Sequence, residues 1–350
     1  MRLFAAGVLT ALVLAAVPAT ALAAFTVTTT ADTYDATCDA QCSLRDAVSA
    51  ANAAAGDDVI TLPAGTYRLT RLGAQENANV TGDLDVTSVI TVEGAGAGTT
   101  VIDAVGADRV IEAASGALTM RDVTVTGGAL RITGPGCAPS DFEGAGIASR
   151  VDLVLQRVRV TGNRYSGTSC SSNRGGGVNL GGGGTHTLTV TGSEISDNYA
   201  SDGGGGIQFY GTTLTIRDSS ITANSTDNTA GGLGADADAV TIVNTTISDN
   251  SAQSSGGIGL SGVTGAQIAS STITGNLART GEGGGIGRLS SSSTVTLRNT
   301  VLAANTSLAG GDDCGSTANI TYSSAGYVLA GPACPIVGGT GNVITADPGL

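Results

Sequence analysis

The sequence predicts an all-β fold, a parallel β-helix in which every coil contributes three short strands. One segment returns four times at a constant interval of 26 residues, beginning at Leu188, Leu214, Val240 and Ala266. Glycine makes up 54 of the 350 residues, and charged residues make up only 13%, well below the roughly 25% of ordinary globular domains. A fixed period in this range is typical of a solenoid, in which one repeat is one coil stacked on its neighbours.

The coil that begins at Leu188 illustrates the predicted strands. Its first strand, Leu188–Val190, alternates apolar and polar residues, as expected for a strand with one buried face. A second strand surrounds Ile195, and a glycine-rich segment leads into a third strand centred on Ile207. Successive coils should rise by roughly 4.8 Å and bury a continuous apolar column. A leucine-rich repeat has a similar period, but leucine is sparse here and no helical half-repeat is visible, so we reject this alternative.

Asparagine recurs at one phase of the repeat. The residues are Asn198, Asn224, Asn250 and Asn276, followed by Asn305 after a three-residue slip. Asparagine tolerates the left-handed turn conformation, and in a stack its amide can bond to the equivalent residue of the next coil. We therefore predict a structural ladder of amides rather than a ligand-binding face.

The first 23 residues have the pattern of a secretory signal peptide. Arg2 precedes an apolar stretch that reaches Val17, and residues 21–23 match an A-x-A cleavage site. We expect the mature chain to begin near Ala24 and to be secreted or displayed at the cell surface. No later stretch reaches the roughly 20 apolar residues of a membrane-spanning helix, so we predict no transmembrane segment in the mature chain.

Residues 42–56 form the one good helix of the chain. The helix should begin with a capping box at Ser43 and Asp46 and stop at Gly56. Its apolar face is formed by Leu44, Ala47, Val48 and Ala51. Such a helix would cover the open end of the coil stack.

Six cysteines in an exported chain indicate disulfides. Equivalent strands begin at Leu118, Leu153 and Leu188, so two coils are 35 residues long and each carries nine extra residues. Cys137 and Cys170 lie in these insertions at nearly the same phase, which favours a bridge between neighbouring coils. The local pairs Cys38–Cys42 and Cys314–Cys334 then follow.

The charged and reactive residues exclude several functions. All 16 basic residues are arginine, and with 29 acidic residues the net charge is −13, which argues against nucleic acid as a partner. His186 is the only histidine and lysine is absent. Metal sites built on histidine pairs, Schiff-base chemistry and thiolate nucleophiles are therefore not expected. We predict no catalytic residue and no cofactor.

The N-terminal segment resembles the CSLREA-type domain of exported bacterial proteins. The matching segments are CSLRDAVSAAN at residues 42–52 and DVITLPAGTY at residues 58–67, with Asp46 where the family's name has Glu. The later repeats resemble right-handed parallel β-helix proteins, which form pectate-lyase-like solenoids. The resemblance implies an exported surface protein and no one reaction. We expect a signal peptide at 1–23, a cap with the first coils at 24–103, and β-helix repeats at 104–350 that are incomplete at the C-terminus.

Enzymes that cleave polysaccharides often use the right-handed β-helix and provide the main alternative. A polygalacturonase-like site needs Gly-His-Gly and Arg-x-Lys, whereas His186 lies between threonines and lysine is absent. A pectate-lyase-like calcium site needs several aspartates, and the available ones repeat with the turns: Asp197, Asp218 and Asp249. Residues 231–236 match only the start of a calcium-binding nonapeptide, and Asp83 with Asp85 are too few ligands. No metal site is predicted.

Aromatic residues and arginines gather between residues 140 and 210. An aromatic platform with arginines could hold sugar rings; the candidates are Tyr165, Tyr199, Tyr210, Arg164 and Arg174. The competing interpretation is that the tyrosines fill turn positions and Phe209 fills the core.

Two functions follow from these observations. The leading hypothesis is a secreted or surface-displayed protein with a structural, adhesive or ligand-presenting role. Its partners would be extracellular glycans or a host or neighbouring cell surface. The alternative is a protein that binds or cleaves polysaccharide, and an enzyme of this kind would be a lyase or a glycoside hydrolase.

Overall fold

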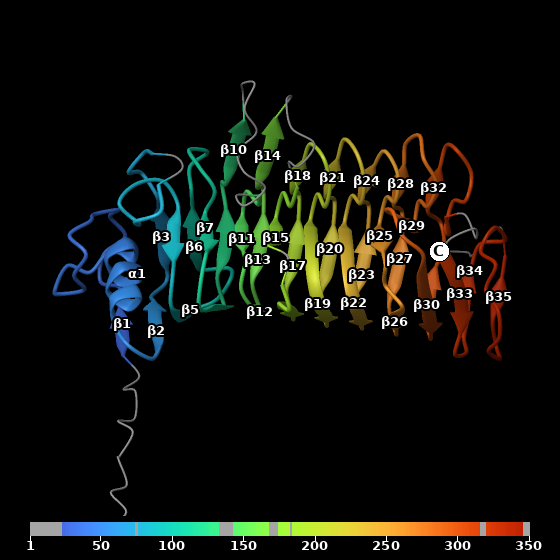
Figure 1. Ribbon diagram of the computed structural model, residues 1–350, viewed down its shortest axis with the longest axis horizontal. Coiled ribbons are helices and arrows are strands. Elements are labelled where there is room, and N and C mark those ends of the chain that lie inside the picture. The colour runs from blue at the N-terminus through green and yellow to red at the C-terminus, as the bar shows by residue number, and fades with distance from the viewer. Residues whose placement is uncertain are drawn as a thin grey trace, which may run out of the picture.

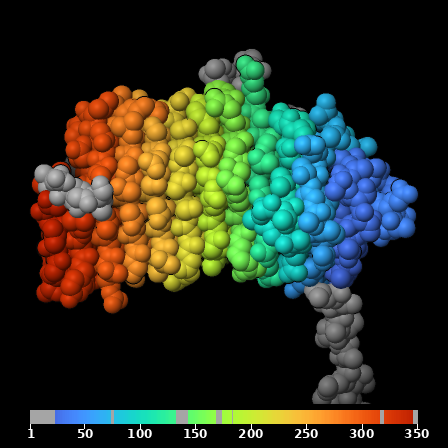
Figure 2. Space-filling view, turned by 180° about the vertical axis from the view of Figure 1, so that it is seen from behind, coloured from blue at the N-terminus to red at the C-terminus, as the bar shows by residue number. Residues whose placement is uncertain are grey.

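The computed structural model describes residues 23–73, 76–132, 143–167, 174–182, 184–315 and 320–345. The strands wind into stacked coils that form an elongated body, with a helix at the N-terminal end (Figure 1). Viewed from behind, successive coils form bands that follow one another along the molecule in sequence order (Figure 2). Strand pairing is parallel throughout the described residues. The predicted parallel β-helix is confirmed.

Sheet A contains 17 strands in two rows, which the long strands β19 and β22 join. One row consists of β1 (Ala24–Thr26), β2 (Asp57–Leu62), β5 (Val89–Gly94), β8 (Ala117–Arg121), β12 (Leu153–Gln156), β16 (Thr187–Thr191), β19 (Ile207–Arg217), β22 (Leu233–Val243), β26 (Gly265–Ala269), β30 (Ser293–Arg298) and β33 (Ile320–Ser324). The other row adds β4 (Leu84–Val86), β7 (Ile111–Ala113), β11 (Ile147–Ser149), β15 (Val178–Leu180), β25 (Ile258–Ser261) and β29 (Ile286–Arg288).

Sheets B and C complete the coils. Sheet B contains β3 (Gly65–Arg68), β6 (Thr100–Asp103), β9 (Thr124–Thr126), β13 (Arg159–Thr161), β17 (Glu194–Ser196), β20 (Ser220–Thr222), β23 (Thr246–Ser248), β27 (Thr272–Thr274), β31 (Thr300–Leu302), β34 (Val328–Ala330) and β35 (Val343–Ile344). Sheet C contains β10 (Ala129–Ile132), β14 (Arg164–Gly167), β18 (Tyr199–Ala200), β21 (Ser225–Thr226), β24 (Ser251–Ala252), β28 (Leu277–Ala278) and β32 (Thr306–Ser307).

The repeat period sets the register between coils. Leu188 pairs with Leu214, and Leu214 pairs with Val240, so residues 26 apart stand side by side. These side chains are fully buried and belong to one apolar column that runs the length of the stack. A single coil could not bury such a column, so each coil depends on its neighbours for stability.

The two long coils keep the same register despite their insertions. Leu118 pairs with Leu153, and Leu153 pairs with Leu188, as the 35-residue spacing predicts. The extra residues follow β10 and β14, which rise above the stack in Figure 1. Cys137 and Cys170 lie outside the described residues, and so does the bridge predicted between them.

The asparagine ladder is confirmed. Each side-chain amide donates to the next Oδ1 along the stack, at 3.0 Å from Asn198 to Asn224 and 2.9 Å from Asn250 to Asn276. The ladder begins one coil earlier than predicted, at Asn163. It ends at Asp313, whose Oδ1 accepts the amide of Asn305 at 2.8 Å. These amides are buried but satisfied, as buried polar groups must be.

A row of turns between sheets A and B adopts left-handed backbone. One residue per coil has φ between 48° and 58°: Asp122, Arg157, Gly192, Asp218, Asn244, Ser270 and Asn299. Glycine, asparagine and aspartate enter this region at low cost, which explains their frequency at this phase. The row carries exposed polar side chains along the edge of the stack.

Helix α1 (Leu44–Ala53) covers the N-terminal end of the core. Ser43 is its N-cap and forms the predicted capping box with Asp46. The four predicted apolar residues are buried. The helix ends at Ala53, before the predicted stop at Gly56, because Ala54 is already extended.

The burial of Arg45 in α1 was not predicted from the helical pattern. Its side chain is fully buried and forms an ion pair with Asp32 at 2.8 Å. It also donates to the backbone oxygens of Gly82 at 2.7 Å and Asp83 at 2.8 Å. Arg45 therefore ties the helix to the loop that precedes β4.

Two predicted disulfides are confirmed, Cys38–Cys42 beside α1 and Cys314–Cys334 in the last coils. No helix in the described part of the chain is long and apolar enough to cross a membrane. Residues 1–22 lie outside the described residues, so the signal peptide stays a prediction.

Candidate functional site

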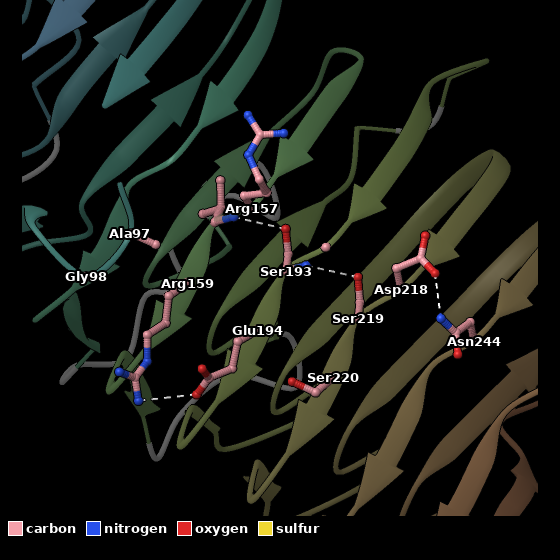
Figure 3. Close-up of a pocket in the computed structure, with 12 residues that line it drawn as sticks. Ala97, Gly98, Arg157, Arg159, Ser193, Glu194, Asp218, Ser219, Ser220 and Asn244 are labelled. Atoms are coloured by element: carbon pink, nitrogen blue, oxygen red, sulfur yellow. Dashed lines mark hydrogen bonds and ion pairs between the residues drawn. The ribbon is translucent and has the colours of Figure 1, made fainter. Parts of the chain in front are cut away.

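Among the described residues, two hollows on the coil stack are large enough for a ligand. The first is a groove of about 610 Å³ between sheets A and B (Figure 3). Its charged side chains come from three successive coils: Arg157, Arg159, Glu194 and Asp218. The loop at Ala97 and Gly98 forms part of its lining.

The charged groups of this groove are paired with one another or with their neighbours. Arg159 lies 3.2 Å from Glu194, and Asn244 donates to Asp218 at 2.6 Å; both pairs are visible in Figure 3. Arg157 forms an ion pair with Asp122 at 2.6 Å. The arginines and carboxylates of the groove therefore already have polar partners within the protein.

The second hollow lies on the outer face of sheet A and has a volume of about 290 Å³. We call it the sheet A hollow; its lining residues are Arg174, Gln208, Tyr210, Thr229, Asp236, Ser261, Leu289 and Ser290. Strand register places Tyr210 beside Asp236 and Asp236 beside Ser261 on neighbouring coils. Polar side chains from successive coils therefore converge on one recess.

Arg174 and Tyr210 form the centre of the sheet A hollow. The Arg174 guanidinium donates to the Tyr210 hydroxyl and lies 5.7 Å from the centre of its ring. Its Nε lies 2.9 Å from Asp202, which also accepts from Asn228 at 2.7 Å. Burial raises the pKa of Tyr210 to about 12, although the Arg174 charge opposes the shift. The hydroxyl thus stays protonated and can donate at neutral pH.

Hydroxyl groups line the opposite side of the hollow. Ser261 donates to Asp236 at 3.1 Å and lies 2.6 Å from the hydroxyl of Ser290. Asp236 ends the segment that matches the start of a calcium-binding nonapeptide. The structure places residues 233–236 of that segment in β22, in register with the neighbouring coils, as an ordinary part of the repeat.

The five predicted ligand-binding residues fall into three places. Arg174 and Tyr210 meet in the sheet A hollow. Arg164 and Tyr199 lie on the outside of sheet C, where the guanidinium covers the ring at 3.8 Å and the Tyr199 hydroxyl donates to Asp227 at 2.5 Å. Tyr165 is only 2% exposed.

This arrangement corrects the expected aromatic platform. The ring of Tyr165 is buried and cannot stack on a ligand from solvent, while an arginine already covers one face of Tyr199. Ligand binding by the five residues stays a prediction. Sequence reasoning missed Gln208, Asp236 and Ser261, because only strand register brings them to one recess.

A buried acidic cluster lies near the N-terminal end of sheet A. Asp83, Asp85 and Glu112 place carboxylate oxygens within 4.8 Å of one another. Carboxylates of this kind suit Ca²⁺ or Mg²⁺. However, the buried Arg109 guanidinium lies 2.9 Å from Asp83 and 3.2 Å from Glu112, and Arg150 lies 3.5 Å from Glu112. Arginine therefore supplies the positive charge, and the cluster fits an ion-pair network better than a metal site.

Comparisons with known proteins give a family but no reaction. No curated protein matches the chain. Among solved structures, the A-module of the mannuronan C-5 epimerase AlgE6 of Azotobacter vinelandii matches over 86% of this chain and 87% of its own. Its sequence identity is 18% and its TM-score is 0.35, too low for its activity to bear on this chain. The family model described as "Right handed beta helix region" matches residues 113–302. Since that match spans more than half of the sequence, the chain belongs to the right-handed β-helix family.

Proposed function

We propose that this chain is an exported β-helix protein that binds an extracellular glycan in the sheet A hollow. The observation that carries the proposal is the convergence of Arg174 and Tyr210 with Asp236 and Ser261 in one recess of about 290 Å³. Sugars present apolar ring faces and hydroxyl edges. A recess that combines an aromatic ring, a guanidinium, a carboxylate and hydroxyls can contact both.

The layout of the hollow suits an extended ligand. Tyr210, Asp236 and Ser261 lie on neighbouring parallel strands, which are roughly 4.8 Å apart. A glycan chain that follows the axis of the stack would meet a polar side chain on each coil. A protein that binds a glycan in this way would have an adhesive or ligand-presenting role, and the sheet A hollow would be its binding site.

The sheet A hollow is preferred over the groove between sheets A and B. The groove is larger, but its arginines and carboxylates are paired with each other. A ligand in the groove would have to displace those ion pairs or bind on their solvent-exposed side. The strongly negative chain also disfavours polyanionic nucleic acid at either place.

Export is part of the proposal and has two supports. The first is the predicted signal peptide at residues 1–23. The second is the pair of disulfides at Cys38–Cys42 and Cys314–Cys334, because such bonds persist in oxidising compartments. Detection of the protein in the culture medium or at the cell surface, with a mature N-terminus near Ala24, is the expected result.

Binding is tested with Arg174→Met. A glycan array identifies ligands of the wild-type protein, and calorimetry then measures their affinity. Because Arg174 organises the hollow through Tyr210 and Asp202, we expect at least a tenfold loss, about 1.4 kcal/mol. The matched control is Arg298→Met in β30, an exposed arginine that does not line the hollow. Equal losses in both variants, or none in either, would contradict the proposal.

Catalysis is the alternative outcome of the same experiment. Incubation with neutral and acidic polysaccharides, followed by assays for reducing ends and unsaturated products, should show no turnover. Products formed by the wild type and absent with Arg174→Met would replace the binding role with a lyase or hydrolase activity.

A further inference from the structure

Two carboxamide side chains lie next to each other on the outer face of sheet A. Asn179 is the middle residue of β15, and Gln208 is its register partner in β19. They are only 5% and 2% exposed. Gln208 lines the sheet A hollow, and Asn179 lines a small adjoining recess of about 10 Å³. The two amides therefore form a continuous polar floor across neighbouring coils.

Neither amide has a hydrogen-bond partner in the part of the chain that the structure describes. Asn179 Oδ1 is buried without one, and the Gln208 side chain forms no side-chain hydrogen bond. The asparagine ladder of the same coils behaves differently: Asn198 and Asn224 donate and accept along the whole stack. A buried amide oxygen left unpaired, as at Asn179, is rare and destabilising. An unpaired buried group in a native structure needs an explanation, and a ligand that completes the bonding is one.

The space around the pair is kept open by small residues. The register neighbours on either side are Ala148 and Gly234. A Cβ added at Gly234 would lie 2.5 Å from Gln208 Oε1, so only glycine leaves this oxygen in place. The register neighbours on the two outer sides of the pair therefore supply no polar side chain.

We infer that Asn179 and Gln208 are the specificity-determining residues of the glycan site and that its ligand is an uncharged sugar polymer. The inference rests on the proposed function. Each carboxamide offers two donors and one acceptor oxygen, which match hydroxyl groups that both donate and accept. Gln208 would contact the sugar chain in the hollow of about 290 Å³, whereas the recess of about 10 Å³ at Asn179 has room for a single hydroxyl group of that chain.

The charges around the floor disfavour an acidic polymer. The two recesses are lined by the carboxylates Glu112, Glu143 and Asp236 against the guanidinium groups Arg150 and Arg174. The whole chain carries a net charge of −13. Arg150 and Arg174 already face the carboxylates Glu112 and Asp202, so a polymer with a carboxylate on every sugar would bring negative charge that these arginines are not free to balance.

The test separates a ligand-binding amide from a structural one. Gln208→Met and Asn179→Leu keep the side-chain volume and remove the polar groups. If these amides serve a ligand, the thermal midpoint should stay constant or rise, because neither substitution removes a hydrogen bond and Asn179→Leu removes an unpaired buried oxygen. Affinity for neutral oligosaccharides of glucose, mannose or xylose should fall about tenfold or more. The matched control is Asn224→Leu, a buried and fully bonded amide of the ladder, whose midpoint should fall by several degrees.

The outcomes are distinct. A midpoint that falls in Gln208→Met as it does in Asn224→Leu would make the amides structural and overturn the inference. Unchanged affinity of Gln208→Met for a ligand that needs Arg174 would overturn it while leaving the proposed function intact. Tighter wild-type binding of oligogalacturonate or oligomannuronate than of neutral chains would also overturn it. A wild type that binds none of these glycans would refute the proposed function itself, and the inference with it.

Discussion

At the scale of the residue, Asp85 links the stability of the stack to pH. Its side chain is buried beside Glu112 and accepts from the backbone N–H of Asn79 at 2.8 Å. Burial raises the pKa of Asp85 from 3.8 to about 7, although the Asn79 bond opposes the shift. Burial likewise raises the pKa of Asp83, against the opposing charge of Arg109. The folded protein therefore binds a proton at Asp85 more tightly than the unfolded chain does.

This difference predicts a pH-dependent contribution with a definite sign. Because the pKa of Asp85 is higher in the folded protein than in the unfolded chain, protonation of Asp85 stabilises the fold. This contribution to the free energy of unfolding is fully present below about pH 4 and is lost as the pH rises to about 7. Its size is at most about 4 kcal/mol. In Asp85→Asn the part of the pH dependence that comes from Asp85 should disappear, while the part that comes from Asp83 remains. Denaturant unfolding of both proteins from pH 4 to pH 8 measures the difference. Parallel curves for wild type and variant would refute the assignment.

At the scale of the element, α1 depends on a buried arginine rather than on its apolar face alone. The apolar residues were predictable from helical spacing and are buried as expected. Arg45 was not, since arginine in a helix is usually exposed. Its burial depends on the loop before β4, whose carbonyl oxygens at Gly82 and Asp83 receive its donors. That loop is far from α1 in the sequence, so no local pattern shows the contact.

The substitution Arg45→Met should destabilise the packing of α1 on the N-terminal end of the stack. The substitution leaves Asp32 buried without its guanidinium partner, which typically costs about 3–5 kcal/mol. Denaturant unfolding should show that loss, and limited proteolysis should cut first near α1. The control is Arg68→Met, because Arg68 is largely exposed and lies 3.6 Å from Asp103; its loss should stay below about 1 kcal/mol. Similar losses in both variants would refute the role of Arg45 in holding α1 to the loop before β4.

At the scale of the whole molecule, the asparagine ladder and the apolar column join the coils into one structure. The ladder runs without a break from Asn163 to Asp313. Each coil is stabilised by the coil on either side, as in other solenoids. A defect in the middle should therefore weaken two interfaces at once.

Asn250→Ala provides that defect. Asn250 donates to Asn276 and to the backbone oxygen of Ile221, and it accepts from Asn224. Its removal leaves buried groups unpaired, so the free energy of unfolding should fall by about 3 kcal/mol. Ser248→Ala, which changes a hydroxyl on the outside of sheet B, should stay within about 0.5 kcal/mol. Hydrogen exchange should show faster opening on both sides of the mutated coil. An effect confined to one side would argue against coupling through the ladder.

The site was less predictable than the fold. Arg174 and Tyr210 were predicted because aromatic residues and arginines gather between residues 140 and 210, and the structure brings them into contact. Tyr165 and Tyr199 were picked out on the same grounds, but one is buried and the other is covered by Arg164. Whether a side chain on a coil is open to solvent depends on the loops and side chains of its neighbours, which the repeat pattern does not describe.

The sequence by itself determined the coils, their register and the asparagine ladder. A period of 26 residues places chemically equivalent residues side by side, and burial then selects one face of each strand. Only the tertiary structure decided which polar groups lack partners. Asn198 and Asn179 are both buried asparagines. Asn198 lies beside another asparagine of the ladder and bonds to it, whereas Asn179 lies between Ala148 and Gln208 on the adjacent strands. Hydrogen-bond satisfaction is a property of three-dimensional neighbours, so the difference between a structural amide and a candidate ligand-binding amide appears only in the folded stack.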